Sequence, residues 1–286
     1  MSIRFLEPAH FDEAVSALSE YGDEAKLIAG GTAVVLMLQQ KLIAPTVLVS
    51  LGRIAGGDFI RREEDGLHVG ALATLRDTER SPVLRQFCPA LAHAFGVVGN
   101  VRVRNQATVG GNLAEADYAS DPPAMLLALD ARVKTLSLQG SREIPLRDFF
   151  LGFYTTALDS TEILTEIVVP NLSPNARATY LKYTSRFAED RPCVGVAAVL
   201  DMDEDGCCRD LRVGIGAATE TPQRLFEVEA QVQGEYLTDE IIQSVAEAYA
   251  QELEPLEDQR GSAWYRREMI RVFVRRALEE VRNGRR

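Results

Sequence analysis

The sequence is poor in residues that hold metals or form disulfides. Its 286 residues include four cysteines, and no two of them are spaced as a CxxC pair: Cys88, Cys193, Cys207 and Cys208. The adjacent pair 207–208 cannot supply normal ligand geometry with the other two so scattered. Buried or loop thiols in a reducing compartment are therefore favoured over a zinc or iron–sulfur site. We expect no metal ligand on this chain.

Histidine is equally scarce. His10, His68 and His93 are dispersed, and neither a Ser/His/Asp nor an HExxH arrangement can be assembled from them along the sequence. This disfavours an enzyme that relies on its own side chains for acid–base chemistry, and we expect no catalytic side chain here. If the protein performs redox or group-transfer chemistry, a bound cofactor has to supply it.

Long apolar runs and an excess of positive charge are also missing. The formal net charge of -11 argues against nucleic acid or an anionic membrane surface as the main partner. The longest apolar run, LIAGGTAVVLML, is broken by glycines and is too short to span a bilayer. The opening MSIRFLEPAHFDEAV lacks the basic-then-apolar order of a signal peptide. These features predict a cytoplasmic location.

The first third of the chain predicts a small β-α-β unit. Residues 11–20 carry apolar side chains at helical spacing. AKLIAGG then predicts a strand that runs into a glycine turn, and TAVVLMLQQKL predicts the next helix, with Thr32 as its N-cap. TVLVSL predicts the strand that completes the unit.

The rest of the chain predicts mixed helices and strands. GLHVGALATLRDTE alternates like a strand and ends in a helix start, SPVLRQFCPALAHAFGVVG and PPAMLLALDA are helical, and ARVKTLSL and EILTEIVVP are strands. After Pro170, YLKYTSR, VGVAAVLDMD and LRVGIGAAT predict an antiparallel meander. Two helices follow, one capped by a threonine at 238 and one beginning at Ser262.

Two glycine segments are candidates for binding. AGGT at 29–32 lies at a strand-to-helix junction, and TVGGN at 108–112 is followed by a carboxylate, Asp121. Neither segment is a GxGxxG or a phosphate-loop fingerprint, and each alone is explained as a tight turn. Together they fit an extended ligand that carries a pyrophosphate and a ribose. On the residues alone, both interpretations stay open.

Four segments carry a resemblance. AGGTAVVLMLQQKL, TVGGNLAEADYASDPPAMLLALDA, TEILTEIVVP and YLKYTSRFAED resemble the FAD-binding medium subunit of the molybdenum hydroxylases, the family of carbon monoxide dehydrogenase and bacterial xanthine dehydrogenase. The resemblance covers nearly the whole chain in the expected order. It implies an α+β protein with a two-subdomain FAD-binding fold of the PCMH/vanillyl-alcohol-oxidase type over residues 1–172, the subdomains being about 1–55 and 56–172. A C-terminal domain over residues 173–286 then contains a three-stranded antiparallel sheet with helices.

The resemblance also implies a set of FAD contacts. The two glycine turns are expected to grip the pyrophosphate, Asp121 to bond ribose or adenine groups, and Leu164 and Lys182 to contact the flavin side. The alternatives are that Asp121 caps the helix at Pro122 and that Lys182 is a solvated strand lysine. The full set is Leu27, Ile28, Ala29, Gly30, Gly31, Thr32, Ala33, Val34, Val98, Thr108, Val109, Gly110, Gly111, Asn112, Asp121, Leu164, Lys182 and Arg191.

Two positions depart from the family pattern. Ala33 follows AGGT where relatives frequently carry Asp or Ser, which removes one polar contact. Arg191 stands where relatives often place an apolar or aromatic residue against the flavin ring. We expect its guanidinium either to stack on the ring or to pair with Glu189 or Asp190, and a solvated turn arginine is the alternative.

The resemblance implies an electron-transfer subunit of a larger oxidoreductase. FAD would bind this chain, while molybdopterin would bind a large subunit and two [2Fe-2S] clusters a small subunit, in a dimer of heterotrimers. Substrate would be oxidised on the molybdopterin subunit, and electrons would pass through the clusters and FAD to NAD, a quinone or oxygen. Two alternatives are a stand-alone flavoprotein oxidoreductase and a flavin-free scaffold subunit with the same fold.

Overall fold

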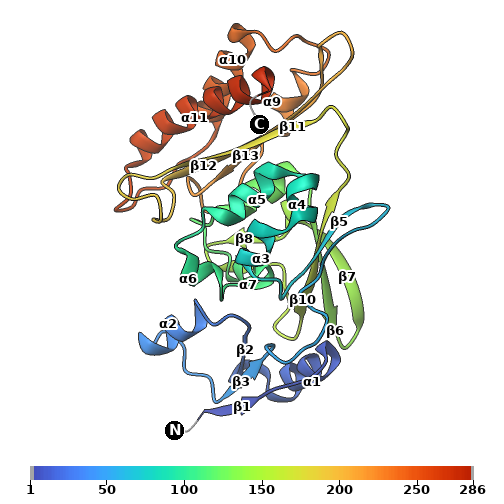
Figure 1. The fold of residues 1–286 in the computed structure, drawn as a ribbon. Helices are drawn as coiled ribbons and strands as arrows, with labels where there is room; N and C mark the ends of the chain where they lie inside the picture. Colours follow the sequence, from blue (N-terminus) through green and yellow to red (C-terminus); the bar gives the residue numbers. More distant parts are fainter. Residues whose placement is uncertain (1–2, 285–286) are drawn as a thin grey trace.

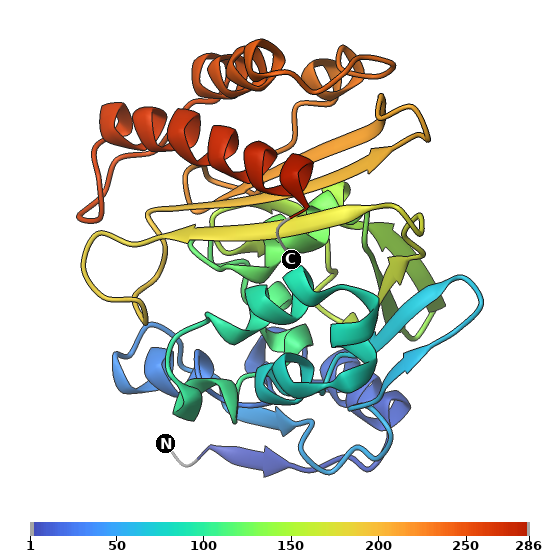
Figure 2. The same ribbon diagram turned by 45° about the horizontal axis from the view of Figure 1, so that its top comes forward.

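The computed structural model describes residues 3–284, which form an α+β protein. Three larger sheets follow one another along the molecule, each with its own helices (Figure 1). Turning the molecule brings the third sheet and its two covering helices to the front (Figure 2).

The first sheet is parallel and has the order β1-β3-β2. Helix α1 packs on it through Ala14, Val15 and Leu18, which are buried. Helix α2 has no buried residue. The predicted β-α-β unit is confirmed as β2 (Ala25–Ile28), α2 (Val34–Gln39) and β3 (Val47–Ser50), and the helix predicted over residues 11–20 is α1 (Phe11–Tyr21). The strand β1 (Arg4–Leu6) was not predicted.

The second sheet has five strands in the order β4-β5-β10-β6-β7, all antiparallel to their neighbours. A group of short helices covers it, and α8 is buried at every position. The elements of this part are β4 (Ile60–Arg62), β5 (Gly66–Gly70), α3 (Leu75–Arg80), α4 (Pro82–Phe87), α5 (Pro89–Gly96), α6 (Val101–Arg104), α7 (Val109–Glu115), α8 (Pro122–Ala128), β6 (Arg132–Ser137), β7 (Gly140–Pro145) and β10 (Ile163–Pro170). Between β7 and β10, β8 (Phe150–Gly152) and β9 (Thr155–Thr156) form a separate two-stranded sheet.

The third sheet is the predicted antiparallel meander, in the order β11-β12-β13. Thr238 and Ser262 cap the last two helices, as predicted, since their side chains accept hydrogen bonds from the N–H groups of Ile241 and Tyr265. The elements are β11 (Arg177–Tyr183), β12 (Val194–Met202), β13 (Cys208–Gly216), α9 (Phe226–Ala230), α10 (Asp239–Glu252) and α11 (Ala263–Asn283).

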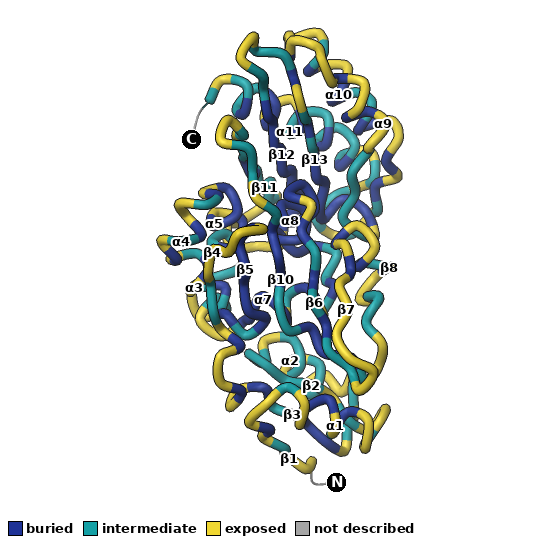
Figure 3. Tube along the Cα trace, turned by 90° about the vertical axis from the view of Figure 1, so that its right-hand side faces the viewer, coloured by how far each residue is buried: buried dark blue, intermediate teal, exposed yellow. Residues whose placement is uncertain are grey.

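The third sheet is buried on both faces, which explains why β12 reads as a nearly continuous apolar run (Figure 3). Ala197 and Val199 face the helices of the second sheet, while Val196 and Ala198 face α10 and α11. Side chains alternate along a strand, so each face collects every second residue. On β11 the same alternation turns Tyr180 toward α8.

One predicted helix start is wrong. Thr32 does not cap α2, which begins at Val34 with Ala33 at its N-cap position and no side-chain capping bond. The chain stays in an open turn up to Ala33 because Gly31 adopts the left-handed region, with φ 74°. None of the described helices is both long and apolar enough to cross a membrane.

Candidate cofactor site

The first glycine turn presents a row of free backbone donors. Within residues 3–284, five consecutive N–H groups donate no hydrogen bond to the protein: those of Gly30, Gly31, Thr32, Ala33 and Val34. All five residues are at least partly accessible to solvent. Backbone N–H groups that lack partners and converge in a turn form a concave site for an anion. Ala33 has no polar side chain to offer a ligand, but its backbone N–H is one of these free donors.

The second glycine turn uses its donors internally. The N–H groups of Val109 and Gly110 donate to the carbonyl oxygens of Ala73 and Ala71, at 2.9 and 2.8 Å. Thr108 caps α7, and its hydroxyl accepts from the N–H of Gly111 at 3.1 Å. A β-carbon on Gly110 would lie 2.6 Å from that of Ala71. This turn therefore docks α7 on the protein, and Gly111 is its exposed glycine.

The two turns touch. A β-carbon on Gly30 would fall 1.7 Å from the carbonyl oxygen of Gln106, just before the second turn. The side chain of Asn112 then exchanges hydrogen bonds with Ser120, at 2.8 and 3.0 Å. These contacts link the free amides of the first turn to the segment that ends at Asp121.

Asp121 is buried and paired with two side chains of β11. Its Oδ1 accepts from the Tyr180 hydroxyl at 2.8 Å, and its Oδ2 accepts from Lys182 Nζ at 3.1 Å. Although it occupies the N-cap position of α8, its side chain makes no capping bond, so the capping alternative is wrong. Burial raises the pKa of Asp121 to about 6, against the opposing effects of Lys182 and Tyr180.

Lys182 is not a solvated strand lysine. Its side chain is 7% exposed, and Nζ also donates to the carbonyl oxygen of Val97 at 2.7 Å. Val98, one of the predicted contact residues, directly follows Val97 in the chain. Because both charges of the Asp121–Lys182 pair are buried, removing one partner would leave the other uncompensated, at a cost of about 3–5 kcal/mol.

Leu164 and the residues that precede the first turn are also predicted to contact FAD. Leu164 is 5% exposed, and the carbonyl of the following residue, Thr165, accepts from the N–H of Ala71, on which Gly110 packs. Leu27 and Ile28 end β2, and together with Ala29 they are partly exposed before the first turn. The structure thus places most of the predicted residues along one contiguous path.

The predicted partners of Arg191 are wrong. Its guanidinium pairs with Asp117, at 2.8 Å, rather than with Glu189 or Asp190. Asp190 is engaged in its own turn, where Oδ2 accepts from the N–H of Phe187.

Sequence reasoning missed Tyr180 and Val97. Tyr180 and Lys182 are two residues apart on a strand, so they share a face and meet the same carboxylate. That spacing was visible in the sequence, but the partner lies 59 positions away from Tyr180. Val97 contributes only a backbone carbonyl, for which the sequence carries no signal.

These features fit FAD. A row of five free amides suits a diphosphate, which carries negative charge and several acceptor oxygens. The Asp121–Lys182 pair offers one acceptor and one donor group a short chain distance from the exposed Gly111. Both the charge and the accessibility of the first turn therefore match such a cofactor.

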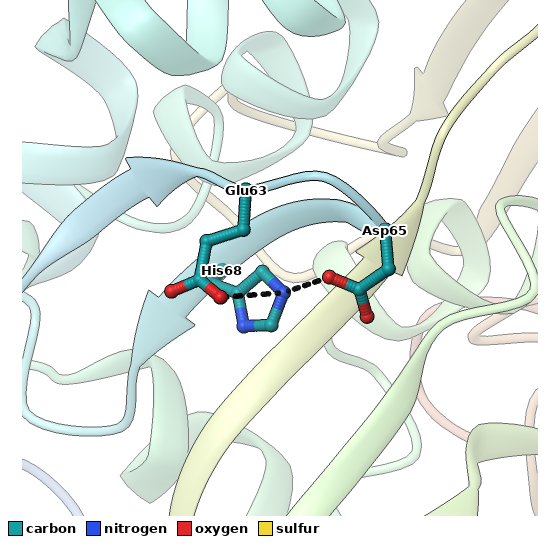
Figure 4. A group of neighbouring side chains, drawn as sticks. All are labelled: Glu63, Asp65 and His68. Carbon is teal, nitrogen blue, oxygen red and sulfur yellow. Dashed lines mark hydrogen bonds and ion pairs between the residues drawn. The ribbon is translucent and has the colours of Figure 1, made fainter.

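A second cluster lies at the β4–β5 hairpin, where Glu63, Asp65 and His68 come within ligand distance of one another (Figure 4). The imidazole of His68 bonds Asp65 at 2.7 Å through Nε2 and Glu166 through Nδ1. Each carboxylate also has a protein cation: Arg61 for Glu63, Arg132 for Asp65 and Lys134 for Glu166. The cluster is therefore explained as an ion-pair network that fixes the hairpin to β10 and β6.

The chain matches two family models. Residues 1–172 match the model described as the FAD binding domain in molybdopterin dehydrogenase, and residues 179–281 match the model of the CO dehydrogenase flavoprotein C-terminal domain.

Relatives match over nearly their full length. The glyceraldehyde dehydrogenase medium chain of Sulfolobus acidocaldarius is 31% identical over 277 residues, covering 97% of each chain. The 6-hydroxypseudooxynicotine dehydrogenase complex subunit alpha of Paenarthrobacter nicotinovorans is 33% identical, covering 94% of this chain and 91% of the relative. A solved structure of carbon monoxide dehydrogenase from Hydrogenophaga pseudoflava superposes with a TM-score of 0.94 at 31% identity, over 98% of this chain and 97% of the other.

Proposed function

This chain belongs to the family of FAD-binding medium subunits of molybdenum hydroxylases, of the carbon monoxide and xanthine dehydrogenase type, and from that premise we propose that it relays electrons from partner subunits to an external acceptor. The free amides of Gly30 to Val34, contiguous with the buried Asp121–Lys182 pair, carry the proposal. FAD, when bound, supplies the redox chemistry, because it exchanges electrons with donors and acceptors.

The residues of this chain bind, orient and balance charge. The first turn holds the diphosphate through backbone donors, where side chains would obstruct it. Lys182 offers a fixed positive charge that favours the electron-rich state of a neighbouring group, and Asp121 balances that charge. The low exposure of both side chains strengthens these electrostatic effects.

We further propose the partners. Electrons would come from a small subunit with [2Fe-2S] clusters, and the organic substrate or carbon monoxide would be oxidised on a large molybdopterin subunit, in a dimer of heterotrimers. The names of the relatives support this, since one is a medium chain and another a complex subunit. The carbon monoxide dehydrogenase structure is described as lacking the Mo-pyranopterin moiety of the molybdenum cofactor, which names that cofactor as part of the relative's enzyme. A cytoplasmic location is supported by four free cysteines. We place the boundary between the flavin part and the C-terminal part near residue 172.

The test compares the isolated chain with the native complex. The isolated chain is expected to purify yellow with bound FAD, and its flavin absorbance is expected to stay unchanged when carbon monoxide, a purine, an aldehyde or an N-heterocycle is added. The native complex is expected to show reduction of the flavin by one of these compounds.

Three outcomes separate the alternatives. Reduction of the flavin in the isolated chain by substrate would assign a stand-alone flavoprotein oxidoreductase. A colourless chain in a complex that remains active would assign a flavin-free scaffold. Purification of the native protein without molybdopterin and iron–sulfur partners would overturn the proposed assembly.

A further inference from the structure

Tyr180 is a fully buried tyrosine whose hydroxyl group donates a hydrogen bond to the Asp121 carboxylate. It is 2% exposed, and its hydroxyl lies 2.8 Å from Asp121 Oδ1. Burial and the neighbouring carboxylate raise the pKa of Tyr180 well above its ordinary value of 10.0, so the phenol keeps its proton and donates it in this hydrogen bond. Tyr180 is therefore a fixed donor to a charged acceptor.

The fold makes room for this phenol. Gly195 on β12 pairs in register with Lys182 on β11, and a β-carbon on Gly195 would lie 2.4 Å from the Tyr180 hydroxyl. Any larger residue at this position would push the phenol away from Asp121. A glycine within a strand weakens the strand, and the close approach of another group is a common reason for its presence. Here that group is the Tyr180 hydroxyl.

The hydrogen bond also joins two parts of the chain. Asp121 precedes α8 beside the second sheet, whereas Tyr180 and Lys182 belong to the third sheet. Each carboxylate oxygen has one donor, so the carboxylate plane is fixed from both sides. Lys182 is fixed in turn between Asp121 and the carbonyl oxygen of Val97.

We infer that Tyr180 is a positioning residue for the flavin site: its hydrogen bond to Asp121 keeps this carboxylate ionised and holds the Lys182 ammonium in place. The inference rests on the proposed function, because the charge that Tyr180 controls lies at the candidate FAD site. Tyr180 acts through Asp121 and has no required contact with the cofactor.

The expected consequence follows from the charge of the pair. With Asp121 ionised, the Asp121–Lys182 pair is neutral, and with Asp121 protonated it carries one positive charge. Tyr180 and Lys182 both lower the pKa of Asp121 and burial raises it, with the net result of about 6. Loss of the phenol hydrogen bond removes one stabiliser of the ionised form, so the pair would become positive at a higher pH.

Other charged groups also face this pair. Asp117, in the segment between α7 and α8, raises the pKa of Asp121. The positive charge of Lys182 lowers the pKa of His93 on α5, while the negative charge of Glu280 on α11 raises it. These groups are unchanged by substitutions of Tyr180, so they contribute equally to a variant and to the wild-type protein.

The experiment measures the flavin midpoint potential against pH in Tyr180→Phe and in the wild-type holoprotein. The wild-type curve is expected to inflect near pH 6, where Asp121 gains a proton. In the variant, the inflection is expected about one pH unit higher, since the lost hydrogen bond went to a charged group. Between the two inflections the variant potential is more positive, and outside that interval the curves coincide.

A matched control is Tyr249→Phe. Tyr249 is also fully buried, and its hydroxyl also contacts a carboxylate, Glu229 Oε1 at 2.9 Å, but it lies among α10 and α11 on the other face of the sheet. This variant is expected to keep the wild-type potential at every pH. A shift equal to that of Tyr180→Phe would overturn the inference, because loosening of the C-terminal domain would then explain both.

The remaining outcomes also decide. Superposition of the Tyr180→Phe curve on the wild-type curve, with FAD bound in both, would overturn the inference alone. Absence of FAD from the wild-type protein would instead overturn the proposed function. If Tyr180→Phe does not fold, Gly195→Ala is measured in its place, because its methyl group displaces the phenol while every hydrogen-bond donor remains. The inflection of its potential–pH curve is expected to move to higher pH, as in Tyr180→Phe. An inflection at the wild-type pH would refute the role of Tyr180.

Discussion

Gly30 lies so close to Gln106 that a β-carbon on the glycine would meet the glutamine carbonyl oxygen at 1.7 Å and its carbonyl carbon at 2.5 Å. The first turn is therefore in backbone contact with the segment before the second turn. A glycine is required at this position by the protein alone, whatever the ligand. The row of free amides that begins at Gly30 depends on this contact for its place.

Gly30→Ala tests this dependence. The methyl group is expected to push the first turn away from Gln106, because the obstructing atoms belong to the backbone and cannot rotate aside. Overpacking of this kind costs about 1–3 kcal/mol of unfolding free energy. FAD affinity is expected to fall at least about tenfold, an energetic loss of about 1.4 kcal/mol. Urea unfolding and titration of the apoprotein with FAD measure the two effects.

Gly52→Ala is the matched control. Gly52 lies in the same N-terminal part, and a β-carbon there would make only an ordinary contact, with Ser50 Oγ at 3.5 Å. Its stability and FAD affinity are expected to equal those of the wild-type protein. Wild-type FAD affinity in Gly30→Ala would mean that the first turn does not hold the cofactor.

Gly111→Val tests the second turn separately. A β-carbon on Gly111 would meet only Thr108 Oγ1, at 2.9 Å, and the residue is exposed. Valine is therefore expected to displace the Thr108 hydroxyl that caps α7, at a cost of about 1 kcal/mol, and to leave the rest of the fold intact. If the diphosphate passes over this amide, the isopropyl group blocks it, and the protein is expected to lose FAD while its melting temperature changes by only a few degrees. Flavin absorbance and thermal unfolding of one preparation give both values.

Gly31→Val is the comparison for that experiment. Gly31 has φ 74°, a conformation that strains a β-branched residue, so this variant is expected to lose both stability and FAD. Full retention of FAD by Gly111→Val would show that the second turn only docks α7 and takes no part in binding.

Local signals in the sequence predicted most of the architecture. The threonine at 238 and the serine at 262 mark helix starts because their hydroxyl groups satisfy N–H groups in the first turn, which is a matter of a few neighbouring residues. The apolar runs after Pro170 predicted the antiparallel meander, and the structure adds that β12 is buried on both faces. Thr32 does not cap the helix because Gly31 adopts a left-handed backbone conformation, and α2 begins only at Val34. Glycine permits this conformation, but its presence in the sequence does not show that the conformation is used.

The site was less predictable because its contacts are distant in sequence. Tyr180 and Lys182 reach Asp121 across 59 and 61 positions, and no local pattern encodes such pairs. The resemblance to a family supplied Asp121 and Lys182, but it did not supply the phenol that holds them. The internal use of the amides of Val109 and Gly110 was also invisible, since TVGGN reads the same whether its donors face a ligand or a neighbouring strand.

His68 predicts a pH dependence of folding. Burial opposes charging of the imidazole, but the hydrogen bonds to Asp65 and Glu166 raise the pKa of His68 above its ordinary value of 6.5. A raised pKa means that the folded state holds the proton more tightly than the unfolded state does. The contribution of His68 is therefore complete below pH 6.5 and is lost as the pH rises through the folded pKa.

His68→Gln measures this contribution. The wild-type protein is expected to lose unfolding free energy from pH 6.5 upward, and the variant is expected to lack that part of the decline. Denaturant unfolding at several pH values provides the curves. His10 is exposed and lies outside the cluster, so His10→Gln controls for general effects of the substitution. Parallel pH curves for wild type and His68→Gln would contradict a charged imidazole in the ion-pair network.

The last prediction concerns Arg191, whose guanidinium pairs with the Asp117 carboxylate at 2.8 Å. The arginine is 56% exposed, so the pair contributes at most about 1 kcal/mol to stability. Arg191→Ala is expected to lower the flavin midpoint potential modestly, because the negative charge of Asp117 loses its partner. A guanidinium stacked on the flavin would produce a fall of the same sign, so the single variant does not distinguish the two arrangements.

The double variant Asp117→Asn/Arg191→Ala separates them. If the two side chains pair with each other, removing both charges removes a neutral pair, and the midpoint potential is expected to return to the wild-type value. If the guanidinium stacks on the flavin, its positive charge is still missing in the double variant, and the midpoint potential is expected to stay below the wild-type value. A potential that stays low in the double variant would therefore place Arg191 against the ring when FAD is bound and show that the contact with Asp117 is exchanged for one with the cofactor.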